Sequence, residues 1–310
     1  MAKRISIGTW AFLFNQKEPV TFEEIVPGLK ELGFDGLELG AFGIHPNPDL
    51  QKTPDERAKV RDMWESRGMS CSGLAPDLWN ERLITAPDTK SYMDTFRKNL
   101  KFATDLGLTV YRVDTTEDPW TLGNVEGETK PDKVTKQVDY DTALKRVCDT
   151  WKQCAQEAAD AGVLIVWEFE PGFAFNKPSD VFRVLDGVNH PNFMVEFDTC
   201  HADNVAAQGR RQPGKKETLK GGIRELAERL KGRIGRLHLI DSDGTLNEHM
   251  TSTHPPFGEG KLKFDEIMPA IAAAGSPDDW WTIDLCFWPD AWKATAKCKK
   301  AIDGLAAKYG

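Results

Sequence analysis

The sequence of 310 residues lacks the features that mark several common protein classes. Its six cysteines include no CxxC pair and are too sparse for a disulfide framework, which favours reduced thiols and a cytoplasmic protein. No stretch approaches the roughly 18 apolar residues of a membrane span, so no membrane association is expected. Basic charge is also in deficit. The formal net charge is −8, which argues against a nucleic-acid partner because such binding relies on a basic surface.

The sequence also lacks a linker rich in proline or glycine. Its content of 40% hydrophobic and 28% charged residues is ordinary for a soluble globular protein, so the core can be large. One stretch, residues 209–216, is locally basic. We interpret it as a solvated loop, with a lid or an anion contact as the alternative. A single domain covering residues 1–310 is therefore expected.

Strand-like and helix-like segments alternate along the whole chain. Eight such pairs predict an α/β protein with a single-domain (β/α)8 barrel, and an open doubly wound sheet is the alternative. Polar insertions are expected at the barrel rim near 115–137 and 203–218. The first four strands are predicted at 5–9, 36–39, 69–74 and 109–113, with helices at 22–32, 54–67, 91–106, 140–161, from 178, near 219–230, and at 264–274 and 291–308.

The last four predicted strands each end at a residue that can bind a divalent metal. These residues are separated by 30, 40 and 46 positions, about the length of one strand, one helix and two loops. The same strand end is therefore presented each time. We expect the four side chains to converge on the rim where barrels of this kind carry their chemistry: Glu168, Asp198, His238 and Asp284.

Each of these residues also has a plainer interpretation. Glu168 could be a rim carboxylate paired with Arg or Lys, because a buried charge needs some partner. Asp198 could cap a helix, leaving His201 on the surface, although a short turn can also return His201 over the same rim. His238 could be a satisfied core residue. If it binds metal, Asp241 could orient its ring by accepting the second N–H.

A site with carboxylates and one imidazole suits Mn²⁺ or Mg²⁺ best, with Co²⁺ or Zn²⁺ as further options. Such a site stabilises an enediolate while a proton leaves the carbon next to a carbonyl. Glu168 and Asp284 come from different strands, so they could remove and return that proton, and His201 could relay one to a hydroxyl group. This arrangement is what a ketose epimerase or an aldose–ketose isomerase needs.

Further candidates follow the other predicted strands. We expect substrate contacts from His201, Glu170, Trp10, Asp114 and His254, and Glu38 and Asp77 are weaker rim candidates. A few aromatic side chains could stack on a sugar ring, while most buried aromatics belong to a core. The aromatic candidates are Trp10, Phe12, Trp79, Trp120, Phe173, Phe257 and Trp288.

Several motifs resemble those of the xylose-isomerase-like barrel superfamily, in particular its sugar phosphate isomerase/epimerase branch. The resemblance spans nearly the whole chain. It implies a metal quartet at Glu168, Asp198, His238 and Asp284 and a substrate-contacting His201. That family normally has Glu at the last position, so Asp284 is a departure that is shorter by one methylene. The motifs are Glu168 with 170–173, residues 190–192, Asp198-x-x-His201, His238-x-x-Asp241 and 257–260.

The same superfamily includes apurinic-site endonucleases of the type-IV class. Their three-zinc cluster needs additional histidines after the early strands. Here the corresponding segments, 74–77 and 113–116, contain no histidine. DNA repair is therefore not the expected function.

The leading hypothesis is a divalent-metal-dependent sugar isomerase or epimerase. The first alternative is a metal-dependent dehydratase or β-eliminating lyase acting on a keto-sugar or keto-glycoside. The second, of a different class, is a non-catalytic sugar-binding barrel. The expected partner is a small-molecule sugar, and the sequence leaves a homo-oligomer open.

Overall fold

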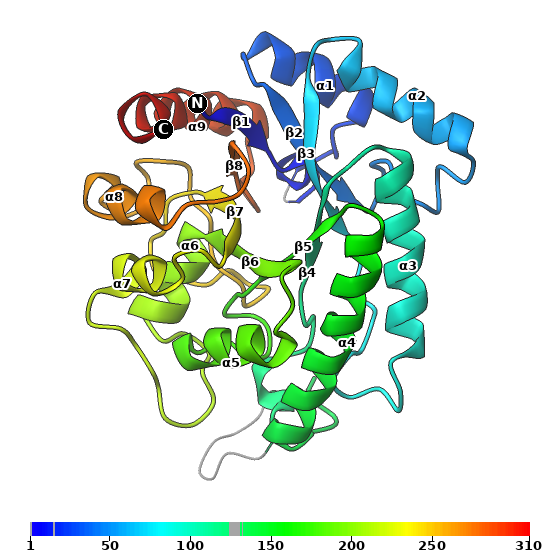
Figure 1. Ribbon diagram of the computed structural model, residues 1–310. Helices are drawn as coiled ribbons and strands as arrows, with labels where there is room; N and C mark the ends of the chain where they lie inside the picture. Colours follow the sequence, from blue (N-terminus) through cyan, green and yellow to red (C-terminus); the bar gives the residue numbers. More distant parts are fainter. Residues whose placement is uncertain (1, 15, 124–130, 132) are drawn as a thin grey trace.

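The structure is a computed structural model that describes residues 2–14, 16–123, 131 and 133–310. Its strands gather at the centre of the ribbon, with the helices outside them (Figure 1). Both chain termini lie beside the last helix. The eight strands are β1 (Arg4–Ile7), β2 (Gly36–Ala41), β3 (Ser70–Pro76), β4 (Val110–Val113), β5 (Leu164–Glu168), β6 (Phe193–Asp198), β7 (Ile234–Leu239) and β8 (Trp280–Ile283).

A long helix follows each strand, at the positions that the sequence predicts to within a few residues. The long helices are α1 (Phe22–Glu31), α2 (Pro54–Glu65), α3 (Lys90–Asp105), α4 (Tyr140–Asp160), α5 (Pro178–Val188), α7 (Gly222–Arg229), α8 (Phe264–Ala274) and α9 (Ala291–Tyr309). Short helical turns lie at η1 (Thr9–Phe12), η2 (Pro119–Thr121), α6 (Thr199–Ala202) and η3 (Asp203–Ala207).

All pairs of neighbouring strands are parallel, in the order β1-β8-β7-β6-β5-β4-β3-β2. A parallel bridge between Gly8 and Glu38 brings β1 and β2 together and nearly closes the sheet. The predicted (β/α)8 barrel is therefore confirmed. Because every strand runs the same way, the residues that end β5 to β8 lie at one mouth of the barrel.

Local sequence signals fix where several helices begin. Pro54 and Pro178 each occupy the first turn of a helix, where the missing N–H costs nothing. Thr53 accepts a hydrogen bond from the N–H of Glu56, whose carboxylate bonds back to Thr53. These signals set where α2 and α5 begin, and therefore where the loops before them end.

The interior of the barrel is unexpectedly polar. Glu38, Glu196 and Arg236 are all buried inside it, where Arg236 donates to the backbone carbonyl oxygen of Ser72 and Glu38 accepts from the hydroxyl group of Thr282. Side chains alternate between the two faces of a strand, so Glu196 points the same way as Asp198, and Arg236 the same way as His238. The strand segments before Asp198 and His238 therefore each carry one buried charged side chain, Glu196 and Arg236, among their apolar residues.

The two rim segments differ in form. Of the segment 115–137, residues 124–130 and 132 lie outside the described residues, and the described part after β4 is irregular apart from η2. The segment 203–218 begins as a π-helical turn, η3, that continues α6. None of the helices that the structure describes combines the length and the apolarity needed to cross a bilayer.

Candidate metal centre

A cavity of about 360 Å³ opens at the mouth where β5 to β8 end. Two of the four predicted ligands, Glu168 and Asp284, line it together with the predicted substrate contact His201, whereas Asp198 and His238 are not among its lining residues. Predicted substrate contacts Trp10, Glu170 and His254 line it as well. Its remaining side chains are Phe14, Phe42, Trp79, Arg112, Thr116, Gly172, Phe173, His249, Thr251, Cys286 and Phe287.

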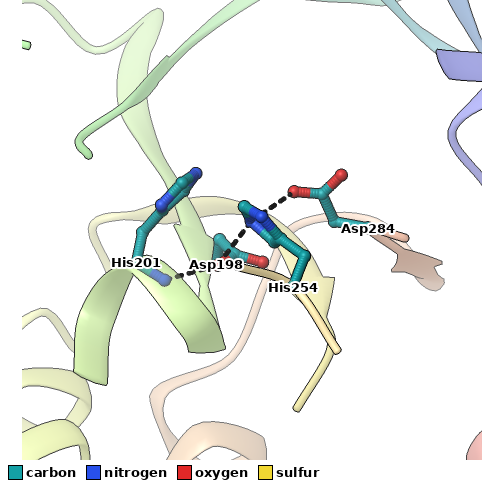
Figure 2. Close-up of side chains that lie close together, drawn as sticks. All are labelled: Asp198, His201, His254 and Asp284. Atoms are coloured by element: carbon teal, nitrogen blue, oxygen red, sulfur yellow. Dashed lines mark hydrogen bonds and ion pairs between the residues drawn. The ribbon is translucent and has the colours of Figure 1, made fainter. Parts of the chain in front are cut away.

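The structure brings the predicted metal ligands together in two adjoining groups. Glu168, His238 and Asp284 can each offer one ligand atom, and these atoms lie within 4.8 Å of one another. His238 Nδ1 is 3.3 Å from Glu168 Oε1 and 3.9 Å from Asp284 Oδ2. Asp198 belongs to the second group, with His201, His254 and Asp284 (Figure 2). Asp284 is therefore shared by both groups.

Four atoms in these groups are buried without a hydrogen-bond partner: Glu168 Oε1, Asp198 Oδ2, His238 Nδ1 and His254 Nε2. Buried polar atoms nearly always have a partner, so four together call for an explanation. A hard divalent cation explains them, because carboxylate oxygens and imidazole nitrogens are the ligands that such ions take. The donor set present therefore fits a metal ion.

His238 is held from its far side by two carboxylates of the barrel interior. Its Nε2 is 3.2 Å from Glu38 Oε2 and 3.1 Å from Glu196 Oε1, which leaves Nδ1 facing Glu168. Burial alone would lower the pKa of His238, but the carboxylates of Glu196 and Glu38 raise it well above its ordinary value. This is the outer hydrogen bonding that fixes the orientation of metal-binding histidines.

The prediction that Asp241 orients His238 is wrong. The carboxylate of Asp241 instead accepts hydrogen bonds from the backbone N–H groups of Gly258, Gly260 and Leu262. Asp241 lies beyond the end of β7, where its short side chain meets the loop before α8. The N–H groups of that loop satisfy it, and the ring of His238 already has partners inside the barrel.

Glu168 divides its two oxygens between different partners. Oε2 accepts a hydrogen bond of 2.6 Å from Arg112, so the ion pair that the plainer interpretation foresaw does exist. Oε1 faces His238 instead. Burial would raise the pKa of Glu168, but Arg112 and the imidazoles of His238 and His201 lower it to about 2. Glu168 is therefore ionised at neutral pH.

His201 is buried rather than exposed, although Asp198 also caps the short helix α6. The backbone N–H of His201 donates to Asp198 Oδ1 at 2.6 Å. Its ring Nδ1 is 2.8 Å from the hydroxyl of Ser252, and Nε2 lies 3.9 Å from Glu168 Oε1. Burial and the neighbouring His254 lower the pKa of His201 to about 3, so the ring is neutral.

The other predicted contacts take different positions. Trp10 Nε1 donates to Asp284 Oδ1 at 2.5 Å. Glu170 accepts a hydrogen bond from Thr251, and burial together with the charge of Glu168 raises the pKa of Glu170 to about 8. Asp114 is not among the cavity-lining residues. It lies buried, 3.9 Å from the guanidinium of Arg112.

Of the predicted aromatic residues, Trp10, Trp79 and Phe173 line the cavity, and Phe12 and Phe257 belong to the main core. Trp120 and Trp288 are not among the lining residues. The sequence prediction missed Phe14, Phe42 and Phe287, which have no periodic pattern to reveal them. Phe14 stacks on Phe42 and Phe287, with ring centroids 5.7 and 4.9 Å apart, and Trp79 packs 4.7 Å from Phe42.

None of the residues in the basic stretch 209–216, all of which the structure describes, lines this cavity. Arg211 forms a 2.5 Å ion pair with Asp118, and Arg210 donates to the carbonyl oxygen of Gly244. The stretch is therefore anchored to neighbouring loops. The alternative of an anion contact at the metal centre finds no support in its position.

Several proteins resemble this chain at low sequence identity. An inosose dehydratase from Yersinia enterocolitica is 22% identical over 221 residues, which are 71% of this chain and 64% of that protein. D-psicose 3-epimerase from Clostridium cellulolyticum H10, solved with D-tagatose, superposes with a TM-score of 0.69 at 16% identity and covers 99% of both chains. The IolI protein with a bound zinc atom gives a TM-score of 0.68 at 18% identity, also over 99% of both.

A probable 3-DHS dehydratase, AsbF from Bacillus anthracis, gives a TM-score of 0.67 at 14% identity over 97% of this chain and 98% of its own. These proteins include an epimerase and two dehydratases, and the likeness to the solved structures among them shows a shared fold. The family model for the xylose isomerase-like TIM barrel matches residues 27–302. The chain therefore belongs to the xylose isomerase-like TIM barrel family.

Proposed function

We propose that this protein is a divalent-metal-dependent isomerase or epimerase that removes a proton next to the carbonyl of a sugar. One observation carries the proposal. Unpartnered, buried ligand atoms of Glu168, Asp198 and His238 lie in two groups that share Asp284, beside a cavity that Glu168 and Asp284 line. Mn²⁺ or Mg²⁺ suits this donor set, and a bound ion would supply Lewis-acid stabilisation of the negative charge that develops on the sugar oxygens.

The residues of the chain have distinct roles in this proposal. Glu168 and Asp284 enter the cavity from β5 and from the end of β8, so each can act as base toward one side of a bound carbon. Arg112 keeps Glu168 charged and fixes one of its oxygens. Trp10 fixes one oxygen of Asp284. His201, neutral and anchored by Ser252, presents Nε2 to a substrate hydroxyl group.

The cavity supports an unphosphorylated substrate. Among its described lining residues, Arg112 is the one Lys or Arg side chain, and Glu168 already binds it. A phosphate group would find carboxylates instead of the cations that it requires. The aromatic rings on the opposite wall can stack on the apolar face of a sugar or cyclitol ring. The substrate class proposed is therefore a neutral sugar.

A dehydratase or β-eliminating lyase on a keto-sugar or keto-glycoside is the second candidate. Glu170 and His201 can both place a polar atom within 4.8 Å of one from Glu168. This arrangement sets an acid beside a base, as departure of a hydroxyl or alkoxyl group requires. The likeness to an inosose dehydratase and to a probable 3-DHS dehydratase also supports this candidate.

A non-catalytic sugar-binding barrel stands as the candidate of a different class. It would bind sugar without a stoichiometric divalent ion and without exchange of any carbon-bound proton.

The proposed cytoplasmic location rests on a separate observation, since all six cysteines are free.

Deuterium exchange tests the proposed function. The protein is loaded with Mn²⁺ and incubated in D₂O with a panel of unphosphorylated keto-sugars, and the products are followed by NMR. Deuterium at the carbon next to the carbonyl, with a new sugar of the same composition, is the expected result. An unsaturated product would select the lyase, and absence of exchange with every metal and sugar tested would contradict both enzymes.

A further inference from the structure

His254 lies in the loop between β7 and α8, and its ring reaches the centre of the candidate metal site. The side chain is 3% exposed. Figure 2 shows the ring between the carboxylates of Asp198 and Asp284. Nε2 is 3.1 Å from Asp284 Oδ2 and 3.8 Å from Asp198 Oδ1. Both are ion-pair separations, and this buried nitrogen has no hydrogen-bond partner of good geometry among the described residues.

The other ring nitrogen shows which side of His254 carries the proton. Nδ1 lies 2.8 Å from the backbone carbonyl oxygen of Ser252. A carbonyl oxygen can only accept, so Nδ1 is the donor. In the neutral ring the lone pair is then on Nε2, and it faces two carboxylates. Without a cation between them, a lone pair and two negative groups would repel one another.

Within each of the two groups, which share Asp284, the separations between neighbouring ligand atoms are those of one coordination sphere. Ligand atoms about 2.1 Å from an ion lie about 3.0–3.4 Å apart when adjacent and about 4.2 Å apart when opposite. His254 is 3.1 Å from Asp284 and 3.8 Å from Asp198. His238 is 3.3 Å from Glu168 and 3.9 Å from Asp284. All four contacts are within the range that a single ion imposes.

We infer that His254 is a protein ligand of the divalent ion, which two imidazoles and three carboxylates would then hold. This inference rests on the proposed function for the presence of the ion. The backbone also suits such a role, because His254 has φ of +45°, a conformation that costs free energy and persists where the surroundings fix it. The carbonyl of Ser252 holds the ring from behind, as outer partners of metal-binding histidines do.

The competing explanation is that His254 is a charged imidazolium that neutralises Asp198 and Asp284. The two explanations predict effects of opposite sign. Removing a ligand weakens metal binding. Removing a positive charge from the site would leave metal binding unchanged or make it tighter, because that charge opposes a cation.

The test compares the wild type, His254→Asn and His249→Asn. Asparagine tolerates a positive φ, so His254→Asn keeps the backbone while removing the imidazole. His249 lies in the same loop and also lines the cavity, but it belongs to none of the described groups that could hold the ion, and its 57% exposed side chain contacts the carboxylate of Glu248. Binding of Mn²⁺ is measured by calorimetry, coordinated nitrogens are counted by pulsed EPR of the Mn²⁺ protein, and thermal unfolding checks that each variant folds.

The expected result is two coordinated nitrogens in the wild type and one in His254→Asn, with Mn²⁺ affinity weakened by about tenfold or more in that variant. His249→Asn should bind Mn²⁺ like the wild type. Equal or tighter binding by His254→Asn, or a single nitrogen in the wild type, would overturn the inference. The wild-type nitrogen count decides the matter even if His254→Asn does not fold. Absence of Mn²⁺ binding by the wild type would overturn the proposed function as well.

Discussion

The two sides of the cavity are built from different chemistry. The side formed by β5 to β8 presents ionisable groups, among them Glu168, His201 and Asp284. The loops that follow β1, β2 and β3 form most of the other side, which presents the rings of Phe14, Phe42 and Trp79, and Phe287 joins them from the loop after β8. The comparison indicates that one half of the barrel provides the reaction and the other half provides the surface on which the substrate rests.

The aromatic side is also separate from the hydrophobic core. Trp10, Phe42, Ala75 and Cys286 form a small buried cluster of their own, against which Phe14 and Phe287 pack. The main core is formed elsewhere, around the barrel and its helices. Changes on the aromatic side should therefore alter substrate binding with little effect on folding. Changes among the ionisable groups should alter the chemistry or the metal affinity.

The largest expected effect comes from Glu168→Gln. The amide can still hydrogen-bond to Arg112, but it cannot accept a proton as a carboxylate does and is a weaker metal ligand. We expect kcat to fall by about 10²–10⁴-fold while circular dichroism shows an intact fold. Glu228→Gln, at an exposed position on α7, is the control. Wild-type turnover in the Glu168 variant would show that the carboxylate of Glu168 is not the base of the reaction.

A smaller effect is expected from Glu196→Gln, because Glu196 contacts His238 and not the substrate. Loss of this negative partner should weaken Mn²⁺ affinity by about 10–100-fold, as measured by calorimetry. Excess Mn²⁺ should restore most of the turnover. If affinity stays the same and turnover is lost at every Mn²⁺ concentration, Glu196 acts otherwise than by positioning His238.

The smallest effect is expected from Trp79→Ala on the aromatic side. Trp79 is 37% exposed, so its removal should leave stability nearly unchanged. Loss of one stacking ring should raise KM by about 3–10-fold at constant kcat. Leu50→Ala, an exposed apolar residue outside the cavity, is the control. A fall in kcat at constant KM would show that the two sides are not divided as proposed.

The sequence predicted the ionisable side better than the aromatic side, for a physical reason. Strands of a parallel barrel end at one mouth, so Glu168, Asp198, His238 and Asp284 could be grouped from their spacing alone. The alternation within strands also carried a signal that the prediction did not use. Glu196 lies two positions before Asp198, and Arg236 lies two positions before His238. Side chains two apart on a strand share a face, so this spacing predicts that both charged side chains face the barrel interior.

The partners of His238 could not be found from local sequence. Asp241 is close along the chain, yet its carboxylate serves the backbone of the next loop. Glu38 is far away along the chain, and the closure of the barrel brings it to His238. Phe14, Phe42 and Phe287 lie in loops, where no period predicts which way a ring points. Only the folded chain places them around the cavity.

The most direct test of the account is the position of the bound ion. Crystals grown with Mn²⁺ would be measured at the manganese absorption edge, and an anomalous difference map calculated. The account predicts one peak at the cavity floor, within bonding distance of Glu168, Asp198, His238 and Asp284. A map with no peak there, or with the carboxyl groups of residues 168 and 284 turned away from a shared ion, would contradict it.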